Sequence, residues 1–76
     1  PTVAVTTNPD GSLTIGGTAE PGTTVKVTNP DGSTETATAG PNGSYSVTTP
    51  PNQPTGEVTA VTADPAGNTS PVTSVS

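Results

Sequence analysis

The chain has 76 residues, one of them basic and six acidic, for a net charge of −5. It has no cysteine and no histidine, which excludes Ser/His and Cys/His nucleophile pairs and zinc or iron–sulfur sites. One cation gives no basic surface for nucleic acid or anionic lipid, and no apolar run approaches the length of a membrane span.

Composition by itself favours a disordered linker, whereas the order of the residues favours a fold. Valine, leucine, isoleucine and phenylalanine fall below the roughly 20 % that separates folded from disordered chains, and proline and glycine are abundant. Apolar residues nevertheless alternate with polar ones in short segments, and turn residues recur about every ten positions. We therefore expect a folded domain, with the disordered linker as the alternative.

The first half of the chain contains four such segments. Alternation over 2–6 predicts a first strand, and Asn8-Pro9-Asp10-Gly11-Ser12 has the residues of a type I turn with a bulge. A second strand runs over 12–19, and Glu20-Pro21-Gly22 turns the chain. The clearest alternation is at 23–28. The pentamer at 29–33 then repeats 8–12 residue for residue, which predicts a second hairpin turn of the same geometry, and a fourth strand follows at 34–39.

The second half contains three more strands. A turn at 40–43 leads into a strand at 44–49, and the proline-rich stretch 50–54 predicts a stiff loop. Strands at 56–63 and 70–75 flank a turn over 64–68. Pro or Gly interrupts every window of helix length, so we expect an all-β sandwich of about seven short antiparallel strands. The expected core is one face of each strand: Val3, Val5, Leu13, Ile15, Val25, Val27, Tyr45, Val47, Val58, Ala60 and Val72.

The outward face is predicted from the same alternation. Lys26 lies between two inward valines, so it should point to solvent, and a buried lysine crosslink is not expected. Val61 should face away from Val58, and Glu35 and Glu57 are expected on exposed faces as solubilising charges.

Three segments resemble one family. Residues 17–25 (GTAEPGTTV), 42–47 (NGSYSV) and 64–70 (DPAGNTS), in this order and spacing, resemble the bacterial Ig-like repeats of giant surface adhesins of the biofilm-associated and repeats-in-toxin types. The resemblance covers essentially the whole chain. It departs at Gly40, where the family often has an acidic residue, and at Tyr45, where it usually has tryptophan.

The resemblance implies an Ig-like β-sandwich, with 1–76 as one unit of a tandem array on the bacterial surface or secreted. Such repeats act as spacers that project a distal binding domain for adhesion or biofilm formation, and calcium rigidifies the junctions in many members. The expected partners are neighbouring repeats of the same chain, without nucleic acid or direct membrane contact, and the isolated domain is expected to be monomeric.

Alternating strand directions assign the acidic residues to two ends of the sandwich. Glu20 and Asp64 fall at one end, and Asp10 and Asp31 fall at the other, so stacked copies would bring four carboxylates to one junction. Calcium binds 6–8 oxygens from carboxylates and carbonyls. We therefore expect a weak inter-repeat calcium site with Asp64 as the first ligand, Glu20 as the second, and Asn68 adding a carbonyl.

Each of these acids also has a simpler explanation. Asp10 and Asp31 suit turns in which the carboxylate accepts hydrogen bonds from the local backbone, and Asp64 before Pro65 suits the start of a turn. Glu20 in its Glu-Pro-Gly corner suits a solvated loop, and the spacing of an EF-hand loop is missing.

We weigh four classes of function for this sequence. A non-catalytic structural spacer agrees best with the resemblance and the lack of chemical groups. A module that binds a glycan or a host protein is the alternative, and it would gain if Tyr45 were exposed, because binding sites are rich in exposed aromatics. An enzyme is not expected, because the domain is too small to wall a substrate cleft around paired carboxylates. The fourth class is the disordered linker.

Overall fold

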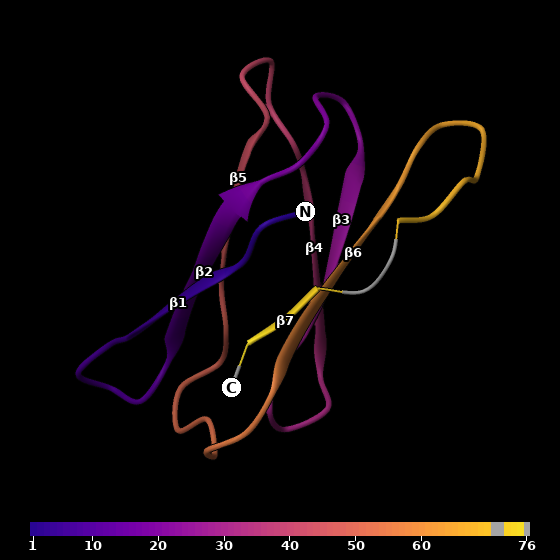
Figure 1. Ribbon diagram of the computed structural model, residues 1–76. Helices are drawn as coiled ribbons and strands as arrows, with labels where there is room; N and C mark the ends of the chain where they lie inside the picture. Colours follow the sequence, from indigo (N-terminus) through magenta and orange to yellow (C-terminus); the bar gives the residue numbers. More distant parts are fainter. Residues whose placement is uncertain (71–72, 76) are drawn as a thin grey trace.

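The structure is a computed structural model that describes residues 1–70 and 73–75, and it confirms the all-β prediction (Figure 1). Among these residues every regular element is a strand, and no helix long and apolar enough to cross a membrane is present. The seven strands are β1 (Ala4–Thr7), β2 (Leu13–Thr18), β3 (Thr24–Thr28), β4 (Thr34–Thr38), β5 (Ser44–Thr48), β6 (Val58–Ala63) and β7 (Thr73–Val75).

The strands form two antiparallel sheets that pack face to face. One sheet has the order β1-β2-β5 and the other has the order β4-β3-β6-β7. Short hairpins join β1 to β2 and β3 to β4, and β4 lies against β5 along one flank, where the chain crosses between the sheets. The opposite flank is bordered by the edge strands β1 and β7 (Figure 1). This is the sandwich architecture expected from seven short strands with regular turns.

The two identical pentamers fold into identical turns, as predicted. In the first, Gly11 N–H donates to the carbonyl of Asn8, and both the N–H and the hydroxyl of Ser12 donate to Asp10 Oδ1 at 2.9 and 2.6 Å. Ser33 makes the same two bonds to Asp31 at the same distances. Glycine follows the acid because its φ is positive there, +82° at Gly11, where most side chains would be strained.

The core matches the predicted inward face with a few differences. The buried cluster consists of Leu13, Ile15, Val25, Val27, Tyr45, Val58 and Ala60, all of them predicted. Val3, Val5 and Val47 pack against this cluster but are only partly buried, because they lie in the edge strands β1 and β5 or just before β1. The prediction missed Ala39, which is 2 % exposed, and Val72 lies outside the described residues.

The outward predictions hold for Lys26, which is exposed in the middle of β3, and for Val61, whose neighbours Val58 and Ala60 face the core. The prediction for Glu35 is wrong. It shares the inward parity of Ala37 in β4, is half-buried, and accepts a long hydrogen bond from Asn29 Nδ2 at 3.4 Å.

The N-terminal segment is fastened to the first sheet through Thr2. Its N–H donates to the carbonyl of Thr18, its hydroxyl accepts from Thr18 N–H at 2.7 Å, and its carbonyl accepts from the hydroxyl of Tyr45. Gly17 faces this contact. A Cβ at Gly17 would lie 2.7 Å from the carbonyl carbon of Thr2 and closer still to its oxygen, so glycine is required by packing rather than by φ.

Candidate functional site

The three predicted ligands converge at one end of the sandwich. This end, here called the Asp64 end, carries the turns at 20–23, 40–43 and 64–68. A shallow pocket of about 170 Å³ lies there, between the β2–β3 turn and the β6–β7 turn. Every residue that lines it carries a carboxylate, an amide or a hydroxyl group: Glu20, Thr23, Thr62, Asp64, Asn68, Thr69 and Ser70. The prediction that Glu20, Asp64 and Asn68 share one end is therefore correct.

Most of the hydrogen-bonding capacity of Asp64 is used within its own turn. Oδ1 accepts from the N–H groups of Ala66 and Asn68 at 3.0 and 2.8 Å, and Oδ2 accepts from Asn68 Nδ2 at 3.2 Å. These bonds, with those from Asn68 first, lower the pKa of the Asp64 carboxyl below its usual value, so the group is ionised at neutral pH. The turn explanation of Asp64 is thus correct, and one lone pair of Oδ2 remains for another donor or a cation.

Glu20 and Asn68 contribute differently to the pocket. Glu20 is exposed, and its main-chain carbonyl accepts from the hydroxyl of Thr23 at 2.7 Å, which fixes the corner but leaves the carboxylate to solvent. Asn68 donates with Nδ2 and keeps its Oδ1 as an acceptor. Among the described residues no three acidic, histidine or cysteine side chains group together, so this chain offers a cation two carboxylates at most.

Asp10 and Asp31 lie at the opposite end, here called the Asp31 end, which carries the turns at 8–12 and 29–33 and the loop at 50–56. The loop joins both turns. Asn52 and Gln53 donate their N–H groups to the carbonyls of Asp10 and Gly11, and Gln53 Nε2 donates to Asp31 Oδ2 at 3.1 Å. Hydrogen bonds from Ser12 and Ser33 lower the pKa of Asp10 and of Asp31, respectively. The hydrogen bond from Gln53 lowers the pKa of Asp31 further. Both turn explanations are therefore correct.

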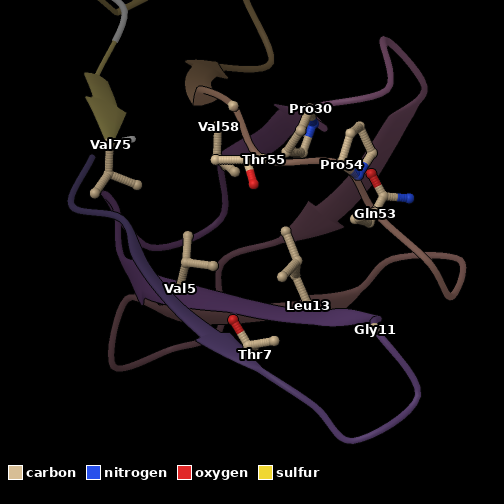
Figure 2. Close-up of a pocket in the computed structure, with 11 residues that line it drawn as sticks. Val5, Thr7, Gly11, Leu13, Pro30, Gln53, Pro54, Thr55, Val58 and Val75 are labelled. Carbon is tan, nitrogen blue, oxygen red and sulfur yellow. The ribbon is translucent and has the colours of Figure 1, made fainter.

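A larger hollow lies near the Asp31 end, and sequence reasoning missed it. This β1–β7 groove has a volume of about 380 Å³ and opens between the two sheets (Figure 2). Figure 2 shows Val5 and Leu13 from the first sheet facing Val58 and Val75 from the second, with Pro54 closing one side. It lies where β1 and β7, the edge strands of the two sheets, border the same flank without pairing with each other, which a strand list without a topology does not reveal.

The sequence and the fold are those of a known family. A model of the bacterial Ig domain family matches residues 1–76. The chain belongs to the bacterial Ig domain family. No curated protein matches the chain as a relative. Domains of this family are generally non-catalytic structural modules and typically occur in extracellular or surface proteins, which agrees with the sandwich of two sheets and with the turn-bound acids of this bacterial Ig domain.

Proposed function

We propose that this bacterial Ig domain is a structural spacer repeat of an adhesin, stacked end to end with neighbouring repeats to project a distal binding domain. The observation that carries the proposal is the placement of the chain's two ends. Thr2 is bonded to Thr18, just before the turn at 20–23 of the Asp64 end, and Val75 pairs with Val58, just after the loop of the Asp31 end. The domain measures 36 Å along its long axis and 20 and 16 Å across it. Copies joined end to end through these two ends would lengthen the array along the long axis of each domain.

The buried aromatic residue supports a spacer over the ligand-binding alternative. Tyr45 is 5 % exposed, with its ring in the core and its hydroxyl on Thr2, so it is not available to stack on a glycan or a partner protein. The acidic side chains likewise serve the turns, as the bonds of Asp10, Asp31 and Asp64 show.

Calcium at the junction between copies is the finer part of the proposal. Asp64 Oδ2, the Glu20 carboxylate and Asn68 Oδ1 retain lone pairs toward one pocket, and a following or preceding copy would add carboxylates from its Asp31 end. Calcium takes 6–8 oxygens, so the site would be complete only when two copies meet. The expected affinity is weak, in the range of extracellular calcium modules.

Small-angle scattering on two copies joined Ser76 to Pro1 tests both parts. A spacer predicts an extended pair, and the calcium site predicts that calcium stiffens the pair and a chelator reverses it. Asp64→Asn keeps the Oδ1 acceptor of the turn and removes the charge, so it should abolish the calcium response, whereas the matched change Glu35→Gln should preserve it. A compact pair would contradict the spacer, and identical curves with calcium and chelator would contradict the calcium site alone.

A further inference from the structure

The β1–β7 groove has the features of a site that accepts an extended strand. Its floor is apolar, with Leu13 and Val58 buried beneath it and Val5 and Val75 on its two walls (Figure 2). None of its lining residues is charged. The groove therefore offers alternate side chains of a strand a place to be buried, which is one half of recognition by strand addition.

The main chain of β1 supplies the other half. In the register of β1 with β2, Ala4 and Thr6 pair with Gly16 and Thr14. On either side of them, the N–H groups of Thr2 and Asn8 donate to the carbonyls of Thr18 and Ser12. The N–H and C=O groups of the intervening Val5 and Thr7 point away from β2. β1 is an edge strand, and within the described residues these groups have no main-chain partner. No charge or proline in β1 blocks the edge.

The charges around the groove decide what kind of strand it accepts. Asp10, Asp31 and Glu57 each stand next to a lining residue, and all three are exposed. Hydrogen bonds from Ser12 and Ser33 lower the pKa of the Asp10 and Asp31 carboxyls, so both are ionised at neutral pH. The single cation of the chain, Lys26, lies on the outer face of β3. A second copy of this chain, with its net charge of −5, would be repelled from this rim.

We propose that the β1–β7 groove binds an extended segment of another polypeptide, with small β-branched residues at alternate positions and basic residues at its ends, which adds to β1 as a further strand. The main-chain groups of Val5 and Thr7 pair with the segment, alternate side chains rest on Leu13 and Val58, and the flanking cations meet the three carboxylates. The inference is separate from the proposed spacer role, because a single copy carries the complete groove.

The charge requirement has a matched test within this chain. The triple variant Asp10→Asn, Asp31→Asn, Glu57→Gln changes the net charge from −5 to −2, and so does the complementary triple Glu20→Gln, Glu35→Gln, Asp64→Asn. Asparagine keeps the turns, because Asn42 already makes the same two bonds to Ser44 in the turn at 40–43. Only the first triple removes charge from the rim of the groove.

The experiment is titration of the 76-residue chain with the peptide Lys-Lys-Val-Thr-Val-Thr-Val-Lys-Lys, followed by amide chemical shifts at low salt. We expect the largest shifts at Val5, Thr7 and Val75, and binding at least tenfold weaker for the same peptide with glutamates in place of lysines. The rim triple should weaken binding about tenfold, and the complementary triple should leave it within twofold.

The edge requirement is tested with Thr7→Pro, which removes an outward N–H at an exposed position, against Thr7→Ala, which keeps it. Binding should be lost in the first and retained in the second, with thermal unfolding measured for both to verify that they fold. Shifts spread over the acidic ends alone, equal loss in the two triples, or binding by the proline variant would each overturn the proposal. Self-association of the chain through the same amides would overturn the choice of occupant.

Discussion

Replacing Gly17 with alanine should release the N-terminal segment from the first sheet. Gly17 does not have a positive φ, so the backbone by itself tolerates alanine, and alanine in a strand is favoured over glycine by about 0.5–1 kcal/mol. The added Cβ would, however, lie 2.7 Å from the carbonyl carbon of Thr2, a distance that real Cβ atoms essentially never show. Gly17→Ala therefore destabilises the domain if the hydrogen bonds of Thr2 hold it against Gly17, and stabilises it if they do not.

The magnitude follows from the bonds that Thr2 would lose. Its displacement breaks the bonds of its N–H to Thr18 O, of its hydroxyl to Thr18 N–H and to the Thr18 hydroxyl, and of its carbonyl to the Tyr45 hydroxyl. At about 0.5–1.5 kcal/mol for each of these bonds, the loss is roughly 2–6 kcal/mol, and the strand preference of alanine reduces it to about 1–5 kcal/mol. In a domain of this size each kcal/mol lowers the melting temperature by about 4–8 °C.

Thermal unfolding followed by circular dichroism measures this change. Gly40→Ala is the matched control, because Gly40 also lacks a positive φ and the nearest atom to its added Cβ would be 3.6 Å away, so its melting temperature should stay the same or rise. Tyr45→Phe should cost about 1 kcal/mol, since it removes only one of the four hydrogen bonds of Thr2. The double variant Gly17→Ala, Tyr45→Phe should be less unstable than the sum, because both changes remove that same bond. A Gly17→Ala variant as stable as Gly40→Ala would refute the reasoning.

Three further predictions concern the core, the turns and pH. Ile15→Ala, at a side chain with no exposed surface, should lower the free energy of unfolding by about 2–5 kcal/mol in urea unfolding, and a smaller change than at half-buried Val61 would contradict the assigned core. Gly22→Ala, at φ +83° with nothing near its Cβ, should cost only the strain of a left-handed backbone, about 1–2 kcal/mol, so an unchanged melting temperature would argue against this turn. The aspartates of the turns have lowered pKa values in the folded chain, so their stabilisation is complete above the usual aspartate pKa near 3.9 and is lost as pH falls through the lower folded value. Unfolding between pH 5 and 2 should show this loss, and a triple Asp→Asn variant should show less of it.

The strands and most of the core were predictable because they depend on local information. Alternation placed Val25 and Val27 inward and Lys26 outward, and the repeated pentamer at 8–12 and 29–33 predicted two turns of the same geometry, all of which the structure confirms. Each of these depends on residues only a few positions apart. Alternation within β6 also predicted correctly that Val58 and Ala60 face the core.

What escaped prediction depends on contacts between distant parts of the chain. The Thr2–Tyr45 bond joins residues 43 positions apart, and the need for glycine at position 17 arises only from that contact. Glu35 was misplaced because a glutamate was expected on an exposed face, whereas it lies half-buried on the same face of β4 as Ala37 and accepts a hydrogen bond from Asn29. The candidate cation pocket was predictable in its location, since strand direction placed Glu20 and Asp64 at one end, but the hydrogen bonds that occupy Asp64 were visible only in the structure.

The length gained with each added copy tests the proposed spacer role most directly. Proteins of one, two and four copies, joined Ser76 to Pro1, would be measured by small-angle scattering under identical conditions. End-to-end stacking along the 36 Å axis predicts that the maximum dimension grows by close to that length with every added copy. A maximum dimension that grows by much less, as in copies folded back beside one another, would contradict the spacer role.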